Sequence, residues 1–235
     1  MQATSARLVK QFFACKPSLI LGLIWVCMVS ASSSVQAATP ASGILVSEGD
    51  SISVSGGGIH STLFANDNPT LRFYALAVGG SGLNNLIDRQ PAILALLRNS
   101  QRRPFVVTVL IGANDLRLYR PAVYANRLMA YAERLRNAGA YVAIGTVLPN
   151  TTPVHNRVRA GFNEILRKRA ARGHFDMLID YDNAPVIGDD SAAWNPSIYP
   201  DGLHPSWEIG QKRMFQVYSR ALNRLYQRID ALSPD

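Results

Sequence analysis

The sequence predicts an α/β fold in which helices cover both faces of one parallel sheet. Three observations lead to this prediction. Five short apolar runs of strand length alternate with longer segments that show helical periodicity. The third run, residues 105–111, is almost wholly apolar, as expected for a strand that is buried on both faces. Glycine and polar residues follow several of the runs, at the edge where a parallel sheet places its ligand site.

Five strands are expected from the apolar runs. The first is brief and ends at Gly49, and the fifth is the weakest of the set. The third is the clearest, because valine and leucine dominate it and valine favours extended backbone. The expected strands cover residues 44–46, 71–78, 105–111, 141–147 and 177–179.

Four helices are expected between and after these strands, each from apolar residues that recur every three or four positions. Pro91 predicts a kink or a restart in the first helix, and Gly139 a stop after the second. Ser206 can cap the last helix, with Glu208 in its first turn. The expected helices cover residues 83–97, 121–137, 155–172 and 206–232.

The first 37 residues have the composition of a secretory signal peptide. Arg7, Lys10 and Lys16 form a basic leader without an acidic residue, and an apolar stretch and small residues follow. Val35-Gln36-Ala37 fits a cleavage site, which would make Ala38 the new N-terminus. We therefore expect export to a periplasm or the medium, with residues 38–235 as a single domain. No internal repeat or second domain is evident in the sequence.

Two alternatives to cleavage remain open. A transmembrane anchor would need roughly 20 apolar residues, and the apolar stretch spans only about 11 to 15. A lipid anchor would need a small residue before a cysteine at the end of that stretch, but Val26 precedes Cys27, and Cys15 lies upstream. Cleavage would remove both cysteines and leave a chain without disulfides, thiols or stable membrane insertion.

The basic charge indicates little about function. The formal net charge of +8 falls to +5 once the three leader cations are removed. Much of the remainder is arginine spread between apolar positions of expected helices, which is typical of a solvated helix face. No recognised nucleic-acid module is present, so no nucleic-acid partner is expected, although a mild attraction to anionic surfaces stays open.

Four short segments carry groups that can take part in catalysis. A serine at a turn into a helix meets outward-pointing backbone N–H groups, and glycine lets a backbone N–H approach a ligand. An asparagine amide can donate into an oxyanion pocket, and a histidine three residues after an aspartate can serve as a supported base. The segments are Gly49-Asp50-Ser51-Ile52, Gly79-Gly80-Ser81-Gly82, Gly112-Ala113-Asn114-Asp115 and Asp201-Gly202-Leu203-His204.

This ordered set resembles the GDSL-type serine hydrolases, also called the SGNH hydrolase superfamily. The family is named for a serine, a glycine, an asparagine and a histidine in four separate blocks, and all four blocks are present here. Ile52 replaces the usual leucine, and Glu48 stands where an apolar or small residue is expected. The glycine block lacks the asparagine that often opens it, with Ala75 or Ala77 nearby. The resemblance implies a flavodoxin-like three-layer sandwich with a five-stranded parallel sheet.

The resemblance also implies a serine esterase mechanism. Ser51 would attack the ester carbonyl, His204 would move the proton, and Asp201 would support the imidazolium. The oxyanion would be held by the backbone N–H groups of Ser51 and Gly80 and by the Asn114 amide, with Gly79 as the rival glycine. Asp50 and Asp115, beside these residues, are interpreted as groups that fix loop geometry by hydrogen bonds.

The sequence leaves several substrates and two rival classes of protein open. A small-molecule ester is expected first, and an O-acetylated polysaccharide or cell-wall sugar second. Trp194, Asn195 and Tyr199 either line a sugar cleft or serve as packing residues, and the sequence favours neither role. A lysophospholipase or thioesterase would need an apolar groove. Its candidate residues are Leu83, Leu86, Leu116 and Leu118.

The rival classes are a nucleotide-binding module and a catalytically inactive adhesin or scaffold. The dinucleotide fingerprint fails because Asn85 stands where its last glycine is needed. The four histidines are scattered, so neither a metal site nor a cofactor is expected.

Overall fold

A five-stranded parallel sheet forms the centre of the domain in the computed structural model, which describes residues 41–54 and 59–232. The strand order is β2-β1-β3-β4-β5, and all four neighbouring pairs are parallel. This is the flavodoxin-like order, so the predicted fold class is confirmed. The strands are β1 (Gly43–Gly49), β2 (Leu71–Ala75), β3 (Phe105–Leu110), β4 (Tyr141–Gly145) and β5 (Met177–Ile179).

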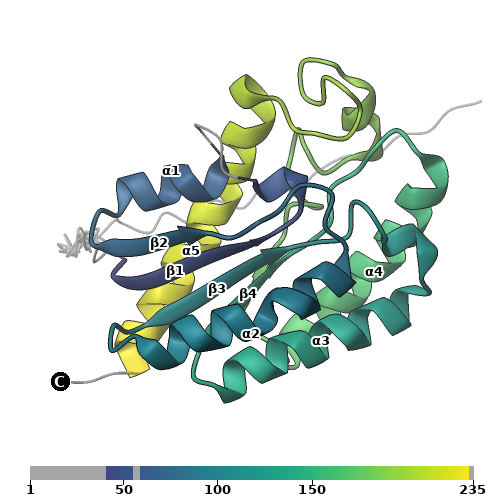
Figure 1. Cartoon of the computed structure of the whole chain (residues 1–235). Helices are drawn as coiled ribbons and strands as arrows, with labels where there is room; N and C mark the ends of the chain where they lie inside the picture. The colour runs from purple at the N-terminus through teal and green to yellow at the C-terminus, as the bar shows by residue number, and fades with distance from the viewer. Residues whose placement is uncertain (1–40, 55–58, 233–235) are drawn as a thin grey trace, which may run out of the picture. The chain divides into compact units, whose positions relative to one another are not determined.

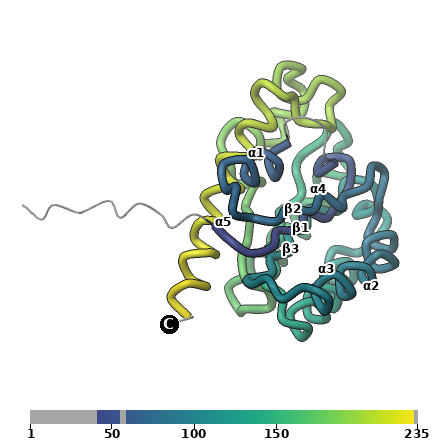
Figure 2. The backbone as a smooth tube through the Cα atoms, turned by 60° about the vertical axis from the view of Figure 1, so that its left-hand side comes forward, coloured from purple at the N-terminus to yellow at the C-terminus, as the bar shows by residue number. Residues whose placement is uncertain are grey.

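Helices cover both faces of this sheet, as Figures 1 and 2 show. One face carries α1 and α5, which pack against each other, and the opposite face carries α2, α3 and α4. None of the helices in the described ranges is long and apolar enough to cross a bilayer. The helices are α1 (His60–Asp67), α2 (Leu83–Asn99), α3 (Pro121–Asn137), α4 (Pro153–Ala171) and α5 (Lys212–Leu232).

Alternation along the strands divides the apolar side chains between two cores. In β1, Ile44 and Val46 point into the core beneath α2, α3 and α4, whereas Leu45 points into the core beneath α5. Successive side chains of a strand face opposite ways, and every residue of β1 and β3 is buried. The apolar run that predicted a doubly covered strand at 105–111 therefore reflects two buried faces.

Three local features differ from the expectation. The helix α1 was not predicted, because its eight residues hold one deeply buried aromatic, Phe64, and little helical periodicity. The helix α2 continues through Pro91 without restarting, and Pro91 lies on its exposed side. A π-helical turn at Trp207–Gln211 precedes α5, and Ser206 caps it by accepting a hydrogen bond from the Gly210 N–H at 3.2 Å.

The predicted signal peptide lies outside the described residues and stays a prediction. The feature of the fold that matters for function is the shared carboxyl edge of the strands. Because all five strands are parallel, the loops that follow β1, β2 and β3 leave from the same carboxyl edge of the sheet. These are the loops that contain Ser51, Gly79–Gly80 and Asn114.

Candidate active site

The turn after β1 presents Ser51 at the edge of the sheet. Gly49 has φ of +153°, and a Cβ there would lie 2.2 Å from the Leu110 carbonyl oxygen, so only glycine fits this close approach. The buried Asp50 carboxylate accepts hydrogen bonds from the N–H groups of Ile52 at 3.0 Å and Ala113 at 3.4 Å. Asp50 thus ties the Ser51 turn to the loop that follows β3.

Ser51, His204 and Asp201 form a hydrogen-bonded series. The Ser51 Oγ lies 2.8 Å from His204 Nε2, although 153 residues separate the two. The His204 Nδ1 lies 2.6 Å from Asp201 Oδ2. A neutral imidazole in this position donates its Nδ1 proton to the carboxylate and keeps Nε2 free to accept the serine proton. The fold therefore brings together three side chains that the sequence places in two distant segments.

Asp201 is held in its ionised form. Partial burial opposes ionisation, but hydrogen bonds from the His204 N–H, the His204 ring and the Leu203 N–H outweigh it and lower the pKa of Asp201 to about 2. The two N–H groups donate to Oδ1 at 2.7 and 3.0 Å. Because Oδ1 accepts from backbone, Oδ2 is oriented toward the imidazole. The Asp201 side chain is 56% exposed, so solvent reaches this end of the series.

Glycine residues after β2 lie beside Ser51. A Cβ added to Gly79 would stand 3.9 Å from the Ser51 Cβ, whereas a Cβ added to Gly80 would have nothing within 4 Å. Of the two glycines that the sequence left open, Gly79 is therefore the one whose Cβ position faces Ser51. In the described part of the chain, the backbone N–H groups of Ser51, Gly79 and Gly80 have no protein acceptor. They are available to bind an anionic oxygen.

Two side chains of the loop after β3 form hydrogen bonds with the glycine loop (residues 79–82) and with the start of α2, which follows it. The Asn114 Nδ2 donates to the Ser81 carbonyl at 2.9 Å, which leaves its second N–H for another acceptor. Asp115 accepts from the Leu83 N–H at 2.6 Å and from the Tyr124 hydroxyl at 2.7 Å. Burial and the Asp115 carboxylate raise the pKa of Tyr124, so the hydroxyl keeps its proton and remains a donor.

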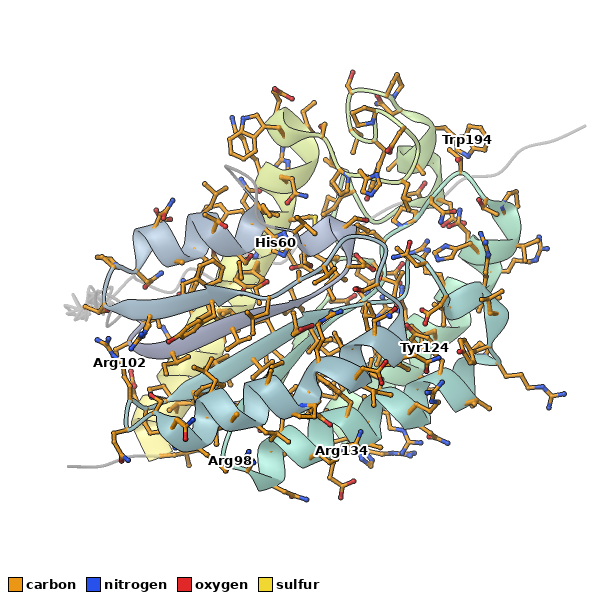
Figure 3. All side chains as sticks on the ribbon, viewed as in Figure 1. His60, Arg98, Arg102, Tyr124, Arg134 and Trp194 are labelled. Atoms are coloured by element: carbon orange, nitrogen blue, oxygen red, sulfur yellow. The ribbon has the colours of Figure 1, made fainter. Side chains whose placement is uncertain are left out.

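The remaining histidines have structural environments. Burial lowers the pKa of His60 to about 4. Its ring, at the start of α1 (Figure 3), bonds Gln211 Oε1 at 3.1 Å, in the π-helical turn before α5. His155 is buried with Nε2 3.4 Å from the Gly112 carbonyl oxygen, and His174 contacts Arg169. Within the described ranges, no group of three or more His, Cys, Asp or Glu could hold a metal ion.

Some of the residues predicted to line a substrate cleft are buried in the core, and others are exposed at the surface. Leu83, Leu86 and Leu116 are fully buried and do not line an open groove, whereas Leu118 is 71% exposed. Tyr199 is also core, because its buried hydroxyl donates to the Ile187 carbonyl at 2.7 Å.

Trp194 is 67% exposed and projects from the periphery of the molecule (Figure 3). Near it in the chain, a polar pocket of about 520 Å³ lies between α4 and the loop after β5. Its lining consists of Arg159, Asp182, Asn183, Ala184, Pro185, Val186, Gly188, Asp189 and Asp190.

Sequence reasoning missed one group near the site, Arg89. It pairs with the buried carboxylate of Glu48, one of the residues that depart from the family pattern. A charged residue shortly after the apolar run 44–46, in a strand expected to be buried, was the signal for a charged partner. The partner lies 41 residues away, and the sequence did not indicate which of the many arginines it is.

Asp50→Asn is expected to change how stability depends on pH. Burial raises the pKa of Asp50 from 3.8 to about 6, opposed by hydrogen bonds from Ile52 and Ala113. The folded state therefore keeps a proton that the unfolded chain has lost, and this stabilisation is full below about pH 4 and gone above about pH 6. The unfolding free energy of Asp50→Asn minus that of the wild type should rise by about 2 kcal/mol between pH 4 and pH 7.

Urea denaturation at each pH measures this difference. Asp67→Asn is the matched control for exchanging a carboxylate for an amide, because Asp67 is exposed at the end of α1. A difference for Asp50→Asn that does not change with pH would show that the carboxyl is not perturbed by burial.

The flavodoxin-like sheet, with a serine, a histidine and an aspartate hydrogen-bonded at its carboxyl edge, has the fold of the SGNH hydrolase superfamily. The chain belongs to the GDSL-like lipase/acylhydrolase family, whose model matches residues 49–212. Structural similarity to solved members of this superfamily agrees with the membership. No curated protein matches the chain.

Three solved structures illustrate the similarity. A lipolytic G-D-S-L family protein from Veillonella parvula is 17% identical, with a TM-score of 0.65 over 77% of this chain and 98% of its own. TesA is 25% identical, with a TM-score of 0.61 over 77% and 99%. Axe2, an acetylxylan esterase from Geobacillus stearothermophilus, is 15% identical, with a TM-score of 0.58 over 80% and 96%.

Proposed function

We propose that this protein is a serine esterase that hydrolyses carboxylic esters through an acyl-enzyme intermediate. The observation that carries the proposal is the series Ser51 Oγ, His204 Nε2 and Nδ1, and Asp201 Oδ2, with contacts of 2.8 and 2.6 Å. A serine hydroxyl is a weak nucleophile until a base takes its proton, and the imidazole is within direct reach of it. The membership in a family of hydrolases supports the same reaction.

The proposed reaction has two halves. Ser51 Oγ attacks the ester carbonyl while its proton passes to His204 Nε2, and the carbonyl π electrons move to oxygen. The tetrahedral intermediate collapses, the bond to the alcohol breaks, and His204 returns the proton to the departing alkoxide. Water then attacks the acyl-Ser51 ester with His204 as base, releasing the carboxylic acid and restoring the Ser51 hydroxyl. Asp201 stabilises the imidazolium in both halves.

The oxyanion is proposed to bind the backbone N–H of Ser51, one glycine N–H and the second N–H of Asn114. Gly79 is favoured over Gly80 as the glycine, because it lies beside Ser51. The N–H groups of the two loops are held by bonds that exist before substrate arrives, such as Asn114 to Ser81. Such preorganised donors stabilise charge that develops only in the transition state.

Asn114→Ala tests this oxyanion site. It should lower kcat for p-nitrophenyl acetate by about 10² to 10³-fold, because one oxyanion donor is lost. KM should change little, since the donor acts on charge that forms after binding. Asn137→Ala, which removes an exposed amide from the last residue of α3, is the control. Wild-type turnover by Asn114→Ala would remove Asn114 from the site.

A carbohydrate or cell-wall O-acetylesterase is the second candidate within the same chemistry. The exposed Trp194 and the polar pocket beside the loop after β5 favour it, because aromatic faces and polar walls suit a sugar. Axe2, which shares the fold, is an acetylxylan esterase. A chain-length series of p-nitrophenyl esters, assayed beside acetylated sugars, separates the two. Activity confined to acetyl groups on glycans would favour this candidate over a general esterase.

Export is part of the proposal. The N-terminal 37 residues carry the basic leader, apolar run and cleavage site of a signal peptide, and they lie outside the described residues. A periplasmic or secreted esterase would meet ester substrates outside the cytoplasm. N-terminal sequencing of the mature protein, with Ala38 as the expected first residue, tests this part.

A further inference from the structure

Glu48 is a buried acidic residue at the end of β1, three positions before Ser51. Its side chain is 0% exposed, in a strand whose other residues are also buried. Burial raises the pKa of Glu48, and the hydrogen bonds and charge of Arg89 oppose the rise. A buried carboxylate without a partner would be very costly. The role of Glu48 is therefore defined by the cation that it pairs with, Arg89.

Arg89 binds Glu48 with two parallel hydrogen bonds. It comes from α2, on the face of the sheet opposite α5 (Figure 1), and its Nε and Nη2 donate to the two carboxylate oxygens at 3.1 and 3.0 Å. This paired geometry fixes the plane of the guanidinium as well as its position. The remaining donors therefore point in fixed directions.

Those donors reach two loops of the proposed oxyanion site. Arg89 Nη1 donates to Ser81 Oγ at 2.9 Å, and Nη2 approaches the Gly49 carbonyl oxygen at 3.4 Å. Gly49 lies two residues before Ser51, and Ser81 directly follows the Gly79-Gly80 pair. The carbonyl of Ser81 in turn accepts from Asn114 Nδ2 at 2.9 Å. One guanidinium thus contacts the nucleophile turn and the glycine loop, and through Ser81 it reaches Asn114.

We propose that Arg89, oriented by Glu48, is a positioning residue that keeps the three oxyanion donors aligned with one another. The inference rests on the proposed esterase function and extends it to residues that do not touch the substrate. Donors aimed at a developing oxyanion lose their effect when they shift by a fraction of an ångström, because the interaction is directional and short. The pair therefore acts on kcat more than on substrate binding.

Arg89→Ala is the central variant. It should lower kcat for p-nitrophenyl acetate by about 10- to 100-fold, the effect expected for losing charged hydrogen bonds that align the donors. KM should stay within about 3-fold of the wild type, because ground-state contacts are retained. Circular dichroism and thermal melting establish the folded fraction, so that kcat is expressed per folded molecule.

The surroundings of Arg89 allow chemical rescue. Arg89 lines an open, mainly apolar pocket of about 360 Å³, so a small cation can reach the space that the alanine variant vacates. Millimolar guanidinium chloride, far below denaturing concentrations, should restore part of the lost kcat, whereas sodium chloride at the same ionic strength should not. Arg89→Lys should recover less, because a lysine cannot reproduce the paired bonds.

Arg136→Ala is the matched control. Arg136 also pairs with a carboxylate, that of Asp176 at 3.2 Å, and its Nη1 also donates to backbone carbonyls, those of Gly173 and His174. It lies in the last turn of α3, and its contacts involve neither the Ser51 turn nor the glycine loop. Its removal should lower the melting temperature without changing kcat or responding to guanidinium.

A double-mutant cycle with Asn114→Ala completes the test. If Arg89 acts partly through Ser81 and Asn114, the Arg89→Ala loss should be smaller in the Asn114→Ala background than in the wild type. Fully multiplicative losses, an unchanged kcat in Arg89→Ala, or a loss confined to KM would each overturn the positioning role. A wild-type enzyme without esterase activity would instead contradict the proposed function itself, so the two failures are distinguishable.

Discussion

Ser51→Ala is expected to lower kcat for p-nitrophenyl acetate by about 10⁴ to 10⁶-fold, one of the two largest losses expected in this protein. The variant keeps the proposed oxyanion donors and His204 but has no oxygen that can form the acyl-enzyme. Stability should change little, because the Ser51 side chain is half-buried and its one hydrogen bond goes to His204. Steady-state kinetics and thermal melting measure the two quantities.

Covalent labelling adds an independent measurement of the same prediction. A fluorophosphonate should attach to Ser51 in the wild type, and mass spectrometry should find no label in Ser51→Ala. Ser191→Ala, which alters an exposed serine in the loop after β5, is the control and should label and turn over as the wild type does. Wild-type turnover by Ser51→Ala would show that the nucleophile has been assigned to the wrong residue.

His204→Ala is expected to produce the second large loss, also about 10⁴ to 10⁶-fold in kcat. Without the imidazole, the Ser51 proton has no acceptor within reach, and the departing alkoxide has no donor. Asp201→Asn should cost less, because the Asp201 side chain is 56% exposed and water can stabilise the imidazolium in its place. Parallel kcat measurements on the two variants check the order of the losses.

His174→Ala provides the comparison for removing a histidine. His174 lies next to Arg169 at the end of α4, and the backbone there takes no part in the Ser51 turn. Its turnover should equal that of the wild type. A larger loss for Asp201→Asn than for His204→Ala would contradict the proposed roles, because support for a base cannot matter more than the base.

The strands and long helices were predictable because their signals are local. The helix at Pro121–Asn137 has the predicted bounds, and the strand at Met177–Ile179 was predicted although it is short. The helix α1 escaped prediction because eight residues with one buried aromatic leave no periodic pattern. Pro91 was misleading, because a proline on the exposed side of α2 removes one backbone donor without ending the helix.

The sequence predicted which segments form the candidate site, but it did not predict how these segments lie relative to one another. The blocks around Ser51, Asn114 and His204 were evident in order and spacing. Whether Ser51 and His204 could meet depended on how β1 and the loop before α5 are placed, and no local pattern carries that information. The proposed choice of Gly79 over Gly80, likewise, rests on tertiary structure, because a Cβ built on Gly79 would lie 3.9 Å from the Ser51 Cβ.

By itself the sequence determined the fold class, the family and the residue types of the candidate site, because alternation, periodicity and short motifs are properties of neighbouring residues. Only the tertiary structure decided which distant groups touch: Ser51 with His204 over 153 residues, and Glu48 with Arg89 over 41. These contacts arise from parallel strands and packed helices that bring remote segments to one edge of the sheet. Their specificity comes from the summed packing of the whole domain, which no short stretch of the chain encodes.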